Sequence, residues 1–164
     1  MDELDRIQQA WASEMPTLNT DSMALIGRLQ ILHKRLTNAM SPNFRHYGLT
    51  DAGFDVLATL RRSGKPYQLT PNQLLGQTLI TSGSLTSRLQ SLEKQGFVSR
   101  HTDAADKRSI VVSLTESGKN VIEQLLVKHV ETQQQLLSGL SAHEQQQLIS
   151  LMRNWLNVTT EPAL

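Results

Sequence analysis

Short side chains that form hydrogen bonds gather in one ten-residue stretch near the middle of the chain. They are Ser82, Ser84, Thr86, Ser87, Gln90 and Ser91. Such side chains can hydrogen-bond base edges and phosphate oxygens, and their small size allows a helix to approach the floor of a DNA major groove. Leu85, Leu89 and Leu92 recur among them at helical spacing and predict the opposite, buried face. The stretch predicts a DNA-recognition helix, and a helix face that meets only solvent is the alternative.

The residues before this stretch predict a second, shorter helix. Thr70-Pro71-Asn72-Gln73 combines a capping hydroxyl, a proline suited to the first helical position and a glutamine placed to close a capping box. This helix can bury leucine side chains before the chain turns at residues 80–83. The two helices with their short turn predict a helix-turn-helix unit.

Two strands are predicted directly after the recognition helix, at residues 97–101 and 109–114. Ile110, Val112 and Leu114 alternate with polar residues, as in a half-buried strand. The polar turn between the strands carries Lys107 and Arg108, and such a hairpin can place an arginine along or into the minor groove. In the alternative interpretation Arg108 pairs with an acidic residue of the turn, Asp103 or Asp106, and only shapes the hairpin.

Charge is unevenly distributed along the chain. Residues 61–108 hold eight basic and three acidic residues, or 8 − 3 = +5, and the remainder carries 8 − 12 = −4, so the total is +1. A basic middle segment favours a nucleic-acid partner, because neutralising phosphates supplies most of non-specific affinity. Chance clustering of the basic residues is the alternative.

Long helices are predicted at both ends of the chain, at about residues 21–41, after Thr115 and after the Ser141-Ala142-His143-Glu144 capping box. Pro42 and Gly48 are expected to bracket the end of the first of them. Their apolar faces exceed what a small winged core can cover, so we expect a homodimer, with packing inside one chain as the alternative. The predicted fold is mainly α with a small β-hairpin wing. Residues 49–115 would form the winged helix-turn-helix domain, and residues 1–48 and 116–164 the helical dimerisation region.

Several function classes find no support in the sequence. The absence of cysteine excludes disulfides, thiolate metal sites and cysteine nucleophiles. The five histidines lack metal-ligand spacing, and no phosphate-binding glycine loop is present. We therefore expect no enzyme activity, no catalytic residues, no metal and no cofactor. Acidic residues near the N-terminus and the lack of a long apolar run predict a cytoplasmic protein with no membrane association.

Two motifs resemble those of the multiple antibiotic resistance regulator (MarR) family of winged-helix repressors. Asp106-Lys107-Arg108 followed by Leu114-Thr115 and Gly118 is similar to the family's wing motif, and Ser82-Gly83-Ser84-Leu85-Thr86-Ser87-Arg88 is similar to its helix-turn-helix. The resemblance implies a dimer with interlocking terminal helices. It also implies binding of double-stranded operator DNA and release by a small, often aromatic acid. A winged-helix module that binds proteins and not DNA is the alternative function.

A narrower resemblance points to the urate-responsive branch of that family, which has an additional N-terminal helix containing tryptophan. The branch's ligand-linked residues match Trp11, Asp55, Arg88 and Arg100. A stacking ring and two guanidinium groups suit a planar anion, and ligand charge near Asp55 could displace its helix. The resemblance thus implies urate or a similar purine as effector. The alternatives are a core tryptophan and arginines that bind phosphate or carboxylate groups.

Overall fold

The computed structural model describes residues 1–78, 82–102 and 107–159, without the side chain of Ser82. In chain order the elements are α1 (Glu3–Glu14), α2 (Asp21–His46), α3 (Asp51–Arg62), β1 (Gln68–Leu69), α4 (Pro71–Gln77), α5 (Ser82–Lys94), β2 (Val98–Thr102), β3 (Ile110–Leu114), α6 (Glu116–Leu137) and α7 (Ala142–Val158). The described parts are mainly helical with one small sheet, which confirms the predicted fold class.

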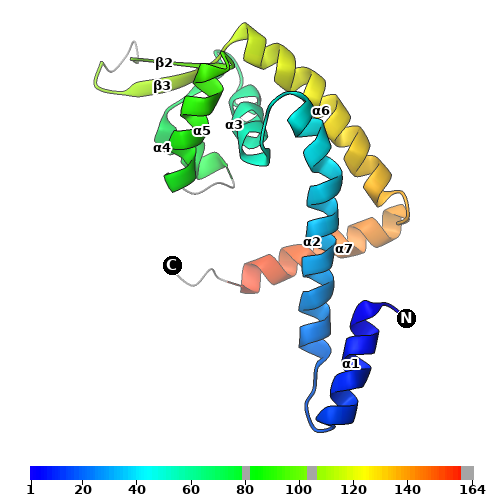
Figure 1. Ribbon diagram of the computed structural model, residues 1–164. Coiled ribbons are helices and arrows are strands. Elements are labelled where there is room, and N and C mark those ends of the chain that lie inside the picture. The colour runs from blue at the N-terminus through cyan, green and yellow to red at the C-terminus, as the bar shows by residue number, and fades with distance from the viewer. Residues whose placement is uncertain (79–81, 103–106, 160–164) are drawn as a thin grey trace.

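The helices α3, α4 and α5 and the sheet form one lobe, from which α2 and α6 diverge as long arms (Figure 1). The helix α1 packs on α2 at the end remote from the lobe, and α7 follows α6 (Figure 1). The structure therefore separates a compact lobe from extended helices at both ends of the chain.

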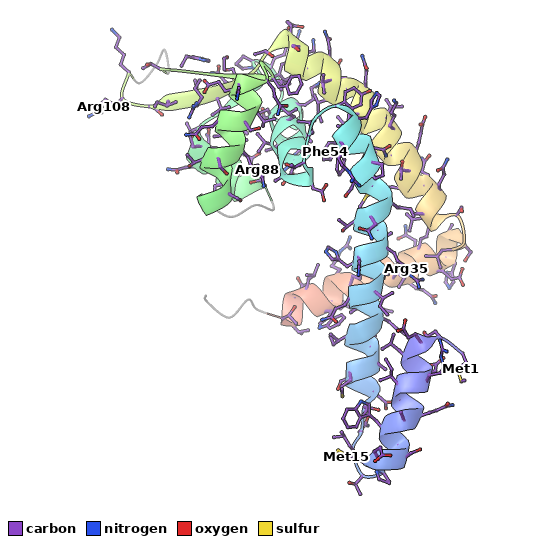
Figure 2. All side chains as sticks on the ribbon, in the orientation of Figure 1. Met1, Met15, Arg35, Phe54, Arg88 and Arg108 are labelled. Atoms are coloured by element: carbon purple, nitrogen blue, oxygen red, sulfur yellow. The ribbon has the colours of Figure 1, made fainter. Side chains whose placement is uncertain are left out.

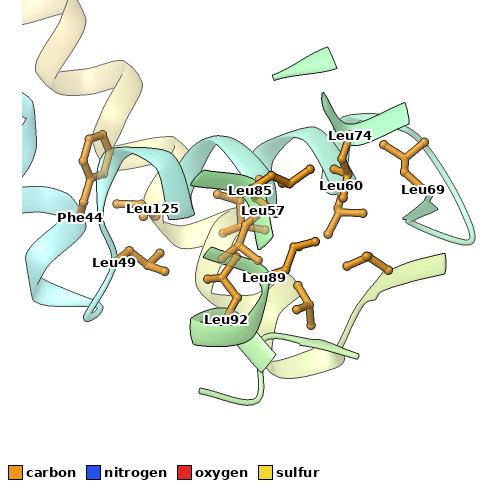
Figure 3. Packing of buried hydrophobic residues seen from close by; sticks show 14 residues of the cluster. Phe44, Leu49, Leu57, Leu60, Leu69, Leu74, Leu85, Leu89, Leu92 and Leu125 are labelled. Atoms are coloured by element: carbon orange, nitrogen blue, oxygen red, sulfur yellow. The ribbon is translucent and has the colours of Figure 1, made fainter. Parts of the chain in front are cut away.

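Leucines from every helix of the lobe form its core. Leu57, Leu60, Leu74 and Leu92 are fully buried, and Figure 3 shows them packed together. Leu125 of α6 and Phe44 of α2 belong to the same cluster, so both arms are anchored in the lobe. Burying each of these large side chains contributes about 1.5–3 kcal/mol.

Hydroxyl side chains cap the starts of α3, α4, α6 and α7, and the caps at Thr70, Thr115 and Ser141 were predicted from the sequence. The hydroxyl oxygens of Thr50 and Thr115 accept hydrogen bonds from the backbone N–H groups of Gly53 and Gly118, at 3.1 and 3.0 Å. Reciprocal capping boxes join Thr70 with Gln73 and Ser141 with Glu144. These caps satisfy N–H groups that the first turn of a helix leaves without partners.

The helix α2 extends past its predicted end near Ser41, continues through Pro42 and ends at His46, which lies between the predicted brackets Pro42 and Gly48. Proline removes one helical hydrogen bond, yet tertiary contacts hold the following turn. Phe44 is buried in the core, and the Asn43 amide donates a 2.8 Å hydrogen bond to the hydroxyl of Thr132 on α6.

The sheet is antiparallel, with strand order β1-β3-β2. Strands β2 and β3 lie within one residue of their predicted positions. The short β1 was not predicted; it pairs Gln68 with Ser113 and Leu69 with Val112. The strand order places β3 at the centre of the sheet. Its Val112 is fully buried and fastens the wing to the lobe.

Several apolar side chains of the terminal helices lie open to solvent. Among the described residues of α7 none is buried, and its exposed apolar side chains are Leu148, Ile149, Leu151, Met152, Trp155, Leu156 and Val158. The chain therefore does not cover the apolar face of α7 by itself.

Candidate nucleic-acid interface

The helix α5 has one buried and one exposed face. Leu85, Leu89 and Leu92 are between 2 and 5% exposed and hold the helix against the lobe (Figure 3). Polar residues predicted to meet DNA lie on the exposed face: Thr86, Ser87, Gln90 and Ser91. Ser84 is half-buried. The leucine stripe thus fixes the helix and leaves most of the predicted DNA-contacting set accessible.

The exposed hydroxyls have local partners that orient them. The Ser87 hydroxyl donates a 3.0 Å hydrogen bond to the carbonyl of Ser84, and the Gln95 amide donates to the hydroxyl of Ser91 at 3.2 Å. Each serine oxygen keeps further hydrogen-bonding capacity, because a hydroxyl has one donor and two acceptor sites.

Lys107 and Arg108 are exposed at the end of the wing. Figure 2 shows Arg108 extending outward from the wing, away from the body of the lobe. The alternative partners Asp103 and Asp106 lie outside the described residues. The side chain of Arg108 is placed where a duplex lying against α5 and the wing could meet it.

The base of the wing is tied to the start of α6 through Thr115. Its hydroxyl lies 2.7 Å from the carbonyl oxygen of Gly96 and 3.1 Å from that of Phe97, and it also caps α6. Thr115 and Gly118, the threonine and glycine of the predicted wing motif, therefore join the end of α5, the wing and α6.

An ion pair links α5 to the wing. The Nε of Arg100 on β2 donates a 3.0 Å hydrogen bond to the Oε2 of Glu93 on α5, and a second guanidinium nitrogen contacts the same oxygen. The bond holds the pKa of Glu93 below its usual value and raises the pKa of Arg100. The guanidinium predicted to bind an effector is thus engaged by a carboxylate of the protein.

Part of the basic middle segment serves the fold. Arg61 pairs with Glu123 of α6 at 2.7 Å, and Arg62 donates to the carbonyl of Gln77. The exposed basic residues of the segment include Lys65, Lys94, Lys107 and Arg108. The charge excess of residues 61–108 therefore overstates the charge available to phosphates.

Arg88 faces a cavity of about 460 Å³ where the end of α2, the start of α3 and α5 meet. The lining residues are Ser41, Arg45, Leu49, Thr50, Asp51, Ala52 and Arg88. Within the described residues the buried Nε of Arg88 has no hydrogen-bond partner. Arg45 was not among the predicted site residues, because it lies beyond the predicted end of the helix near residue 41.

The other predicted effector residues do not converge on this cavity within one chain. Trp11 belongs to α1, which Figure 1 shows far from the lobe. Asp55 is half-buried one turn after Asp51 on α3 and does not line the cavity. A site containing both Trp11 and Arg88 would need a second chain or a rearrangement.

The described residues contain neither a cluster of metal ligands nor a membrane-spanning helix. No group of three or more histidine, aspartate or glutamate side chains in these ranges is arranged to hold a metal ion. No helix in the same ranges is long and apolar enough to cross a membrane.

A helix-turn-helix combined with a three-stranded sheet, two strands of which follow it as an exposed, arginine-bearing hairpin, defines a winged helix-turn-helix protein. A model of the MarR family matches residues 47–109. The helix-turn-helix transcriptional regulator PecS of Dickeya dadantii is 36% identical over 150 residues, which cover 92% of this chain and 90% of PecS. The chain belongs to the MarR family.

Solved structures show the same fold. A MarR variant from E. coli in complex with operator DNA has a TM-score of 0.73 and 26% identity, covering 85% of this chain and 99% of that one. BpsR of Bordetella bronchiseptica has a TM-score of 0.71 and 22% identity, covering 80% and 92%. The protein is thus a DNA-binding transcriptional regulator, and its relatives are regulators and not enzymes. This membership favours DNA binding over the alternative of a protein-interaction module.

Proposed function

We propose that the protein is a homodimeric repressor that binds a pseudo-palindromic operator and is released by a small aromatic or purine anion such as urate. The observation that carries the DNA-binding mode is the exposed polar face of α5 beside a wing that carries Lys107 and Arg108. In this docking mode α5 enters the major groove, and Arg108 reaches the adjacent backbone or minor groove.

The uncovered face of α7 supports the dimer. Leu151 and Leu156 are 66% and 74% exposed, and Trp11 and Ile7 of α1 also face solvent. Pairing two chains through these helices buries apolar surface and presents two copies of α5 to successive half-sites. Half-sites would then be spaced by about one helical turn of DNA, roughly 10–10.5 base pairs, or a multiple of it.

Dimeric binding has a direct test. A duplex selected by the protein from a random pool is titrated and the complex mass is measured by light scattering. Two chains on each duplex support the proposal, and protection of one half-site by one chain contradicts it.

The cavity beside Arg88 supports a small anion as effector. Arg45 and Arg88 supply two guanidinium groups, which suit a planar carboxylate or urate anion. The N-terminus of α3, capped by Thr50, adds favourable partial charge, which the carboxylate of Asp51 in the same lining opposes. BpsR supports this class of effector, since its DNA binding is regulated by 6-hydroxynicotinic acid.

An anion there would contact elements of both the arm and the lobe. Because α5 contributes Arg88 and α2 contributes Arg45, an anion that draws the two side chains together favours one orientation of the lobe against the arm. A changed orientation alters the spacing of the two recognition helices in the dimer. Release from the operator follows if the bound orientation does not fit both half-sites.

Calorimetry with urate, xanthine and salicylate tests the effector. We expect heat of binding with at least one of them, weakened by Arg88→Gln or Arg45→Gln and unchanged in Arg35→Gln, which alters an arginine outside this cavity. If Trp11→Ala also weakens effector binding, the site is shared between two chains. If Trp11→Ala leaves effector binding unchanged, the site is confined to the cavity. Absence of heat with all three compounds contradicts the effector assignment.

A further inference from the structure

The ion pair between Glu93 and Arg100 joins two elements that must meet DNA together. Glu93 lies in the last turn of α5, and Arg100 is the third residue of β2. Both side chains keep about a third of their surface exposed, at 36 and 34%. An exposed ion pair of this kind contributes little to folding stability. We therefore ask how the pair affects the geometry of the wing.

Among the described residues, the side chains of β2 itself give the strand one buried anchor in the lobe. Val98 is buried, whereas Ser99, Arg100, His101 and Thr102 are all exposed. Beyond Val98 the strand therefore gains no anchoring from buried side chains of its own. The pairing with β3 supports the strand as well, through the buried Val111 and Val112, and ends at Ile110, which is 55% exposed.

The pair has the geometry needed to fix an angle. Two nitrogens of the Arg100 guanidinium contact the same oxygen of Glu93, so the contact ties the strand to α5 at one fixed distance. The backbone link from α5 to β2 fixes the base of the wing, where Thr115 is also attached. Because Arg100 lies two strand residues beyond the start of β2, a fixed distance at Arg100 sets the angle of the strand about that link.

We propose that Glu93 and Arg100 are positioning residues for DNA binding. Their ion pair sets the angle of the wing against α5, so that Arg108 and the polar face of α5 reach one duplex at the same time. This role rests on the docking mode proposed above. It assigns to Arg100 a function distinct from effector binding and from direct contact with phosphate.

The neighbouring carboxylate argues against a direct phosphate contact. Glu93 neutralises the guanidinium and would itself repel a phosphate brought close to Arg100. Were Arg100 a phosphate ligand, removal of the Glu93 charge would strengthen binding to DNA. A positioning role predicts the opposite sign, which makes Glu93→Gln the informative variant.

The experiment compares the full-length protein with Glu93→Gln, Arg100→Gln and the charge-exchanged double variant Glu93→Arg with Arg100→Glu. The control is Glu123→Gln, which breaks the similarly exposed pair with Arg61 away from the wing. The probe is a duplex selected by the wild-type protein from a random pool. Affinity is measured over a range of salt concentrations. Hydroxyl-radical footprints report the backbone contacts of the wing, and dimethyl sulfate methylation of guanine N7 reports the major-groove contacts of α5.

We expect Glu93→Gln and Arg100→Gln each to weaken binding by roughly three- to tenfold, as for the loss of about one hydrogen-bonded contact. Protection at the operator flanks should fade while protection in the major groove persists. The double variant should recover most of the affinity, and thermal unfolding should stay close to wild type.

Tighter binding by Glu93→Gln, together with a salt slope reduced by about one in Arg100→Gln, overturns the proposal in favour of a phosphate contact. Equal binding by wild type and both single variants also overturns it. If instead wild type and Glu123→Gln bind no duplex at low salt, the docking mode itself has failed.

Discussion

The first turn of α6 lies directly against the carbonyl group of Phe97, and a Cβ atom on Gly118 would fall 2.0 Å from that oxygen. The obstacle is backbone, which cannot rotate away as a side chain could. Gly118 is therefore required for the close approach that lets Thr115 tie the wing to α6.

Gly118→Ala is accordingly expected to destabilise the fold by about 1–3 kcal/mol, the usual cost of overpacking a close contact. Urea unfolding measures this change. Gly76→Ala is the matched control, since Gly76 is also helical but its added Cβ would meet no atom within 4 Å. A Gly118→Ala protein as stable as wild type would contradict the assigned contact.

Stability should fall in mild acid because of His129. Its ring lies 4.6 Å from that of Phe54 and 5.5 Å from that of Phe44, and burial lowers its pKa from the ordinary 6.5, against a smaller opposing effect of Asp51. The His129 ring therefore binds a proton more readily in the unfolded chain than in the folded protein. The stabilisation is complete above about pH 6.5 and is lost as pH falls toward the lowered pKa.

Urea midpoints between pH 5 and 8 test this, with His129→Gln predicted to flatten the profile relative to wild type. His143→Gln changes an exposed histidine at the start of α7 and should leave the profile unaltered. An identical acid dependence in wild type and His129→Gln would exclude His129 as its source.

Arg108→Ala should weaken operator binding by roughly 1–3 kcal/mol and reduce the salt slope by about one if the arginine meets phosphate or a narrow minor groove. Lys65→Ala removes an exposed charge outside α5 and the wing and serves as the comparison. Anisotropy titrations measure both the affinity and its dependence on salt. If Arg108→Ala keeps the wild-type affinity and salt slope, the wing does not contact the DNA.

Gln90→Ala and Ser84→Ala are expected to change sequence preference more than general affinity, because their side chains lie on or beside the exposed face of α5. Selection from a random duplex pool measures preference at each operator position. Retention of the wild-type preference by both variants would argue against base contacts at these positions.

Leu156→Glu should shift the protein toward monomers and weaken operator binding, because it places a charge in the apolar face of α7. Gln146→Glu adds the same charge at another exposed position of α7 and should remain dimeric. Sedimentation at several concentrations distinguishes them, and a fully dimeric Leu156→Glu protein would remove α7 from the interface.

Local signals in the sequence predicted much of the fold. The capping boxes at Thr70 and Ser141 and the leucine stripe of α5 depend on residues a few positions apart, and the structure confirms them. The helix α2 runs beyond its predicted end near residue 41, because Phe44 and Asn43 hold the last turn through contacts with distant residues. The two-residue strand β1 is too short to show any alternation.

The site was less predictable for the same reason. Residue type and spacing indicated the polar face of α5 and the wing arginine. The Glu93–Arg100 pair and the placement of Arg45 and Arg88 around one cavity depend on how separate elements pack. The predicted effector set of Trp11, Asp55, Arg88 and Arg100 remains a prediction.

The central claim is that α5 and the wing together bind the phosphates and base edges of one duplex. Titrating the purified protein with its selected duplex at several salt concentrations tests it most directly. We expect affinity to fall by about 10³-fold or more between roughly 50 and 200 mM salt for six or more phosphate contacts. Absence of binding to every duplex at low ionic strength, or affinity that is independent of salt, would contradict the claim.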